Sequence, residues 1–172
     1  KALPISELDT MEEIRFATGM GELDRVLGGG AVKGSLVLVG GAPGIGKSTL
    51  MLQICQTLGE KCKVLYVSGE ESTHQIKMRA KRLQVDTENL FVLSETRLSN
   101  VLECVDNEKP DVLIVDSIQT LYNDEAEGIP GGVGQVLQSA ELKQLLMRQQ
   151  PVSLFSEALC ANYFTYTKGA EH

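Results

Sequence analysis

The chain has 172 residues, 42% of them hydrophobic, which is enough for one soluble domain with a buried core. Its 23 acidic residues outnumber its 16 basic ones, and the resulting net charge of −7 does not favour nucleic acid unless a local basic patch or a loop meets it. No apolar run approaches a membrane span of about 18 residues, and the first residues lack the apolar core of a signal peptide.

The four cysteines are far apart and form no C-x-x-C pair. This spacing argues against a zinc site and against a disulfide framework, so we expect a reduced, cytoplasmic protein. His74 and His172 are isolated, and we assign neither of them to a metal.

The N-terminal part is predicted to contain one short helix. Residues 1–17 are polar and mixed in charge, as in an arm or linker. Residues 21–27 place Leu23 and Leu27 on one helical face, and three glycines follow to end the helix. We expect the main domain to span residues 18–155 and leave residues 156–172 as an unassigned tail.

A glycine-rich turn between an apolar strand, residues 36–39, and a helix fits G-x-x-x-x-G-K-[ST], the P-loop pattern. Glycines let successive N–H groups converge on an anion, and the following helix directs its positive end there. Lys47 is expected to reach the β- and γ-phosphates of ATP, and Ser48 to offer its hydroxyl to Mg²⁺. A turn that binds nothing is the alternative. The residues assigned to the nucleotide here are Gly41, Ala42, Pro43, Gly44, Ile45, Gly46, Lys47, Ser48 and Thr49.

Two carboxylates follow the next apolar strand, residues 63–68. Hydrolysis needs a carboxylate near the γ-phosphate, and ligands lie beyond the carboxyl ends of parallel strands, so we favour Glu70 as the base, with Glu71 second. The alternative is that both are acids at the start of a polar helix, residues 72–83. A basic cluster on that helix is read as a solvated face, with a nucleic-acid or inter-subunit role as the second interpretation; its members are Lys77, Arg79, Lys81 and Arg82.

A third strand at residues 90–93 and a helix at residues 97–105 precede a continuous apolar run that ends in Asp116. Such a run is typical of a strand buried on both faces of a parallel sheet. Asp116 is expected to hold Mg²⁺ through its water shell, and Gln119 to contact the γ-phosphate or the attacking water. The alternative for Gln119 is an ordinary polar residue at a strand exit.

Alternating strands and helices predict an α/β fold, a three-layer sandwich around a mainly parallel sheet. Residues 123–134 are acidic and glycine-rich, as in a mobile loop, and a helix over residues 135–147 and a strand over residues 151–155 follow.

Three stretches resemble the bacterial RadA (Sms) family of DNA repair proteins. They are TGMGELDRVLGGGAVKGSLVLVGGAPGIGKSTL, KVLYVSGEES with QIKMRAKRL, and KPDVLIVDSIQTLY. The resemblance implies a RecA-like P-loop core, DNA-dependent ATP hydrolysis, hexameric rings and branch migration of recombination intermediates. It also implies ATP at residues 41–49, Mg²⁺ near Ser48 and Asp116, a water-activating Glu70, and a DNA-facing position for residues 123–134.

The sequence departs from that family at several points. The four-cysteine zinc module, the K-N-R-F-G motif and the Lon-like domain have no counterpart in these residues. Two other functions stay open: a small-molecule kinase, disfavoured because Arg148 is the only arginine after Asp116, and a switch that binds ATP without hydrolysing it.

Overall fold

A six-stranded sheet forms the centre of the structure, a computed structural model that describes residues 3–7, 13–123, 151–158 and 164–167. The order of the strands across the sheet is β5-β4-β6-β7-β3-β8, and all neighbours are parallel except β8, which runs antiparallel to β3. The mainly parallel sheet predicted from the sequence is confirmed. The strands are β3 (Leu36–Gly41), β4 (Val64–Ser68), β5 (Leu90–Ser94), β6 (Val112–Asp116), β7 (Val152–Ala158) and β8 (Phe164–Thr167).

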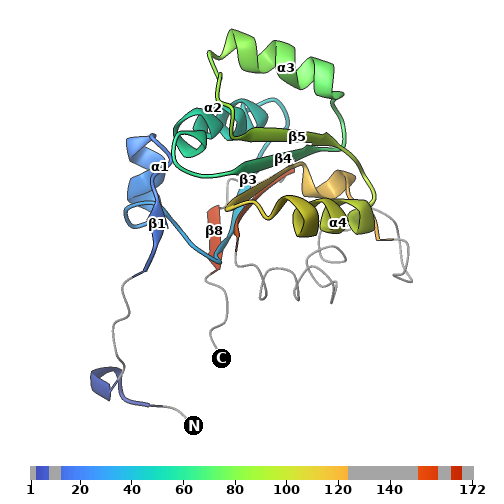
Figure 1. Ribbon diagram of the computed structural model, residues 1–172. Coiled ribbons are helices and arrows are strands. Elements are labelled where there is room, and N and C mark those ends of the chain that lie inside the picture. The colour runs from blue at the N-terminus through green and yellow to red at the C-terminus, as the bar shows by residue number, and fades with distance from the viewer. Residues whose placement is uncertain (1–2, 8–12, 124–150, 159–163, 168–172) are drawn as a thin grey trace.

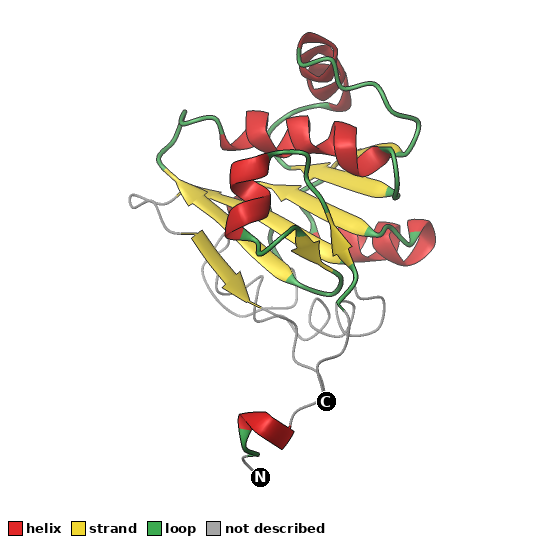
Figure 2. Ribbon diagram, turned by 90° about the vertical axis from the view of Figure 1, so that its left-hand side faces the viewer, coloured by secondary structure: helices red, strands yellow, loops and turns green. Residues whose placement is uncertain are grey.

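Helices cover both faces of this sheet (Figures 1 and 2). Helices α2 (Lys47–Gly59) and α3 (Thr73–Arg82) lie on one face, and α4 (Leu98–Glu108) lies on the other. The predicted three-layer sandwich is therefore correct. Smaller elements complete the described part of the chain: η1 (Ile5–Glu7), β1 (Arg15–Phe16), α1 (Gly21–Val26), β2 (Ala31–Val32) and η2 (Ile118–Thr120).

Strand β4 shows how sequence directs the layers. All five of its residues are buried, as expected for a strand with a helix layer on each side. Because side chains alternate along a strand, Tyr66 packs in the cluster beneath α2, while Leu65 and Val67 pack in the cluster beneath α4. The core is thus split into two clusters, one on each side of the sheet.

The segment before β3 is held by backbone turns that glycine permits. Helix α1 ends at Val26, and the guanidinium of Arg15 donates to the carbonyls of Leu27 and Gly30 at 2.9 and 3.3 Å. Gly30 has a φ of +128°, and a Cβ there would lie 2.7 Å from the carbonyl oxygen of Phe16. A glycine is therefore required where β1 crosses this turn.

Strand β7 extends to Ala158, and β8 lies within the tail that the sequence left unassigned. The domain boundaries at residues 17 and 155 stay predictions. The helix expected at residues 135–147 and all but the first residue of the loop expected at residues 123–134 lie outside the described residues.

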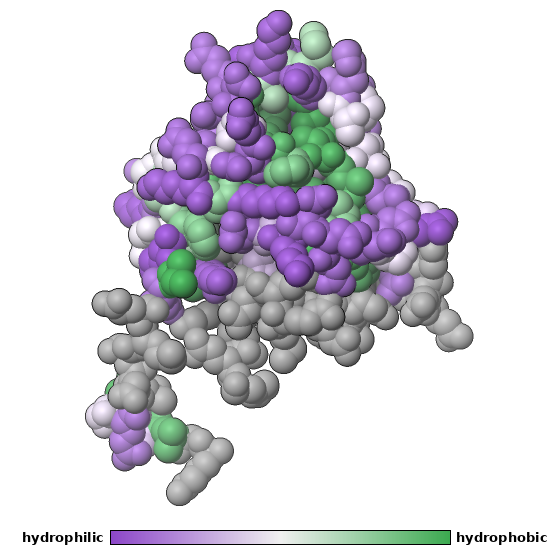
Figure 3. Space-filling view, in the orientation of Figure 1, coloured by the Kyte–Doolittle hydropathy of each residue, from purple (hydrophilic) through white to green (hydrophobic). Residues whose placement is uncertain are grey.

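The surface of the described part is mostly hydrophilic in the view of Figure 3, with hydrophobic side chains gathered around β5, below α3. Exposed Met78 of α3 and Phe91 of β5 contribute to the hydrophobic surface.

No described helix is long and apolar enough to cross a membrane. Cys55, Cys62 and Cys104 are free thiols, and burial raises the pKa of Cys62 to about 11.

Candidate nucleotide-binding site

The residues assigned to the site from the sequence lie at one end of the sheet. Ser68, the last residue of β4, pairs with Asp116, the last residue of β6. Val115 of β6 and Leu38 of β3 pair with the same residue of β7. Two strand spacings of about 4.8 Å therefore separate β6 from β3, so the Asp116 backbone is about 10 Å from the strand that leads into the glycine-rich turn.

The glycine-rich turn depends on left-handed backbone at two positions. Gly44 has a φ of +77° and Gly46 has a φ of +104°, which a residue with a Cβ adopts only with strain. Gly46 is also the residue directly before α2. These two glycines reverse the chain between β3 and α2, as the P-loop pattern requires.

Lys47 folds back over this turn. Its ammonium Nζ donates to the carbonyl oxygens of Gly41 at 2.7 Å and Ala42 at 2.9 Å. The ammonium group therefore lies above the loop rather than extending into solvent. A phosphate bound on the loop would replace these two carbonyl oxygens as the acceptor of the Lys47 ammonium.

The first turn of α2 differs from that of α3. Ser72 and Gln75 form a capping box at the start of α3, so that helix satisfies its own first N–H groups. The start of α2 has no side-chain cap and no acidic residue, and its first residue is the cation Lys47. A cation at a helix N-terminus opposes the helix dipole. An uncapped N-terminus with a lysine above it matches a site for a polyanion.

Asp116 is buried on the same side of the sheet as α2. Ile114, two residues earlier, packs in the cluster beneath α2, and alternation directs Asp116 the same way. Asp116 is 6% exposed, and its Oδ2 accepts a hydrogen bond of 2.6 Å from the hydroxyl of Tyr66. Burial, followed by the nearby carboxylate, raises the pKa of Tyr66 above its ordinary range, so this phenol stays a donor at neutral pH. The peptide bond from Asp116 to Ser117 is cis.

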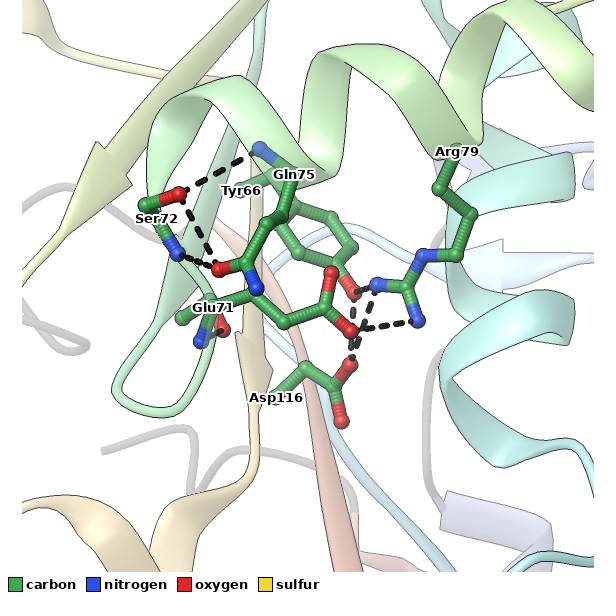
Figure 4. Close-up of polar contacts among 7 residues, drawn as sticks. Tyr66, Glu71, Ser72, Gln75, Arg79 and Asp116 are labelled. Carbon is green, nitrogen blue, oxygen red and sulfur yellow. Dashed lines mark hydrogen bonds and ion pairs between the residues drawn. The ribbon is translucent and has the colours of Figure 1, made fainter.

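Arg79 of α3 joins this buried pair, as Figure 4 shows. Its NH2 lies 3.8 Å from Asp116 Oδ2 and donates to the Tyr66 hydroxyl at 3.3 Å, while its NH1 lies 3.0 Å from Glu71 Oε1. The side chain of Arg79 is only 14% exposed. The reading of the basic cluster as one solvated face is therefore wrong for Arg79, whereas the other three members, Lys77, Lys81 and Arg82, are exposed.

The two candidate bases differ in their surroundings. Glu71 is half-buried and paired with Arg79, while Glu70 is exposed in the turn between β4 and α3. Neither lies in the first turn of α3, which begins at Thr73, so both precede the helix. Gly69, just before them, packs so closely that a Cβ there would overlap the hydroxyl of Thr120.

Gln119 lies beside Thr120 in η2, the short helix that follows Asp116. The contact between Gly69 and Thr120 thus brings the turn that carries Glu70 against the segment that carries Gln119. The structure therefore places two neighbouring segments side by side, one carrying Glu70 and the other Gln119.

The oxygen atoms available at this end of the sheet suit Mg²⁺. The hydroxyl of Ser48, in the first turn of α2, and the carboxylate of Asp116 are hard oxygen donors. Among the described residues, no group of three or more His, Cys, Asp or Glu side chains is arranged to hold a metal. Beside a nucleotide, Mg²⁺ is coordinated by few protein ligands, and water molecules and phosphate oxygens supply the rest. The residues present fit a magnesium nucleotide.

Sequence reasoning missed Tyr66 and misplaced Arg79. Tyr66 stands inside an apolar run, VLYVS, and nothing in its local spacing marks it as polar structure. Arg79 carries a usable signal, because it follows Ile76, the buried residue of α3, by three positions and therefore shares its helical face.

The sequence of this chain is similar to those of known ATPases and DNA repair proteins. The family model for the KaiC ATPase matches residues 16–93, which include the glycine-rich turn and Glu70. DNA repair protein RadA from Listeria monocytogenes is 50% identical over 157 residues, covering 90% of this chain and 34% of the relative. RadA from Pseudomonas aeruginosa is 44% identical over 151 residues, covering 88% of this chain and 33% of the relative. RadA from Bacillus subtilis is 50% identical over 147 residues, covering 84% of this chain and 32% of the relative. The chain therefore spans about a third of the length of the curated relatives it matches.

Proposed function

The chain belongs to the RadA family of DNA repair proteins and carries its RecA-like ATPase core, and we propose that it binds ATP with Mg²⁺ and hydrolyses it in DNA repair. The observation that carries this proposal is the position of Lys47. It stands at the uncapped start of α2 and bonds two carbonyls of the glycine-rich turn. A cation in that place is unfavourable for the helix alone and favourable once phosphates occupy the turn.

In the proposed mechanism, the N–H groups of residues 41–49 and the start of α2 hold the phosphates, and Lys47 neutralises charge on the β- and γ-phosphates. Bound Mg²⁺ supplies further neutralisation of the phosphate oxygens. The Ser48 hydroxyl and the Asp116 carboxylate would hold the ion, Asp116 through water. Most of the rate enhancement then comes from positioning and charge stabilisation.

Glu70 is proposed to orient and deprotonate the attacking water, and Gln119 to contact that water or the γ-phosphate. The difference in their surroundings supports Glu70 over Glu71. Glu70 is exposed at the carboxyl end of β4, whereas Glu71 is already paired with Arg79. The close packing of Gly69 on Thr120 would keep the Glu70 turn beside η2 during turnover.

We extend the proposal to DNA because the relatives carry the name DNA repair protein. On this proposal, ATP hydrolysis is coupled to DNA binding and branch migration by a hexameric ring in the cytoplasm. With a net charge of −7, the chain would meet DNA through local basic groups rather than bulk charge. A basic residue from a neighbouring subunit would complete each ATP site.

The test is phosphate release from ATP by the 172-residue chain, measured with and without Mg²⁺ and single-stranded DNA, alongside particle size from light scattering. We expect Mg²⁺-dependent release that DNA stimulates. Glu70→Gln should bind ATP normally and lose at least about 100-fold in turnover, the usual contribution of a general base. Glu88→Gln, an exposed acid in the turn before β5, is the matched control and should behave like the wild type.

Normal turnover by Glu70→Gln would refute the role given to that residue. ATP binding by the wild type with no phosphate release under any condition would refute hydrolysis and support the ATP-binding switch instead.

A further inference from the structure

Arg79 bridges two carboxylates that belong to different parts of the candidate site. One is Glu71, which directly follows the candidate base Glu70, and the other is Asp116, the candidate magnesium residue. The guanidinium uses a different terminal nitrogen for each carboxylate, NH1 at 3.0 Å and NH2 at 3.8 Å (Figure 4). The same NH2 also donates to the Tyr66 hydroxyl, which itself donates to Asp116.

The Arg79 guanidinium fixes the positions of the Glu71 and Asp116 carboxylates relative to each other. A guanidinium is planar, and its terminal nitrogens point along set lines, so the two carboxylates it contacts are held at a set separation. A lysine ammonium in the same place would supply the charge without that geometry. Without a cation, Glu71 and Asp116 would repel each other, and Asp116 would be a buried carboxylate with Tyr66 as its neutral donor.

A purely structural role explains these contacts poorly. Helix α3 is already attached through buried Ile76 and begins at its own capping box. The Nε of Arg79 is buried and has no hydrogen-bond partner in the described part of the chain. A buried ion pair is weak evidence for stability, because an apolar side chain often serves as well. The other basic residues of α3 avoid this burial.

We propose that Arg79 is a positioning residue that sets the turn carrying Glu70 and Glu71 relative to Asp116. The water-activating group and the magnesium-holding group would then act on the same phosphate. The inference rests on the proposed function, since it concerns how two parts of that ATP site are aligned. It predicts that Arg79 matters for the Mg²⁺ dependence of nucleotide binding and for turnover, and little for binding of nucleotide without the ion.

The experiment is calorimetric titration of the 172-residue chain with a non-hydrolysable imido analogue of ATP, at several Mg²⁺ concentrations. For Arg79→Met we expect metal-free affinity within about twofold of the wild type, because the glycine-rich turn and Lys47 are unchanged. The strengthening of binding by Mg²⁺ should fall at least tenfold, and kcat for ATP should fall at least tenfold. Arg79→Lys should recover only part of both losses. Arg82→Met, an exposed arginine on the same helix, is the matched control and should show neither effect.

A folded Arg79→Met variant with the same Mg²⁺ enhancement as Arg82→Met overturns the inference. If circular dichroism shows that Arg79→Met does not fold, Glu71→Gln decides instead, because it removes one of the two carboxylate contacts. A Glu71→Gln variant with wild-type kcat and wild-type Mg²⁺ enhancement likewise overturns it. Absence of analogue binding by the wild type would overturn the proposed function itself, a result distinct from normal wild-type binding with an unaffected variant.

Discussion

Replacing Lys47 with alanine tests the phosphate site directly. In the folded chain its ammonium donates to the carbonyl of Gly41 in a part-buried hydrogen bond and to the carbonyl of Ala42 in an exposed one. Water can replace those contacts, and removing a cation relieves its unfavourable interaction with the helix dipole, about 0.3–1 kcal/mol. We therefore expect the free energy of unfolding without ligand to change by less than about 1 kcal/mol.

The effect on binding should be much larger. An ammonium about 4 Å from a phosphate charge contributes about 4 kcal/mol at an effective dielectric constant of 20. Lys47 loses its two hydrogen bonds to carbonyl oxygens when it makes this interaction. That loss offsets about 1–2 kcal/mol of the gain. The net loss in Lys47→Ala is about 2–3 kcal/mol, or about 30- to 150-fold in the dissociation constant for ATP with Mg²⁺.

Calorimetry of ATP binding, paired with urea unfolding of the ligand-free protein, measures both quantities. Lys61→Ala is the matched control, since Lys61 is exposed just beyond the other end of α2. The reasoning fails if Lys47→Ala binds ATP within threefold of the wild type, or if Lys61→Ala weakens binding as much as Lys47→Ala.

Two further changes should act at separate places. Gly69→Ala forces a Cβ against Thr120, so the free energy of unfolding measured in urea should fall by about 1–3 kcal/mol. Turnover should also fall, because the turn that carries Glu70 shifts. Unchanged stability would contradict the close contact between Gly69 and Thr120. Hydrogen bonds, led by the backbone N–H of Arg97, lower the pKa of Glu95. Glu95 therefore stabilises the fold at neutral pH and loses this contribution as pH falls below the ordinary glutamate range, so Glu95→Gln should flatten the pH dependence of unfolding below about pH 4.5.

The sequence was most informative where local pattern and local structure coincide. The turn at residues 41–48 is flanked by a strand and a helix in the structure as predicted, because its glycines and its lysine act within one short stretch. Strand β6 was predictable for the same kind of reason, since a short continuous apolar run is typical of a strand covered on both faces, and all five residues are buried.

The contacts around Asp116 could not be predicted in this way, because they depend on which strands become neighbours. Tyr66 and Asp116 are 50 residues apart, and they meet because β4 and β6 pair with Ser68 opposite Asp116. No spacing within either strand encodes that pairing. Strand β8 was missed for a related reason: its four residues form a strand by pairing with β3, far away in sequence.

The position of β7 bears on how the protein forms during synthesis. Strands β3 and β6 leave the ribosome before β7, yet they do not pair with each other, and β7, the strand between them, begins only at Val152. In a nascent chain that stops short of that residue, no strand joins β3, which leads into the glycine-rich turn, to β6, which ends in Asp116. We therefore expect ATP affinity to arise abruptly, once β7 has been synthesised, inserts between β3 and β6, and joins the two halves of the sheet.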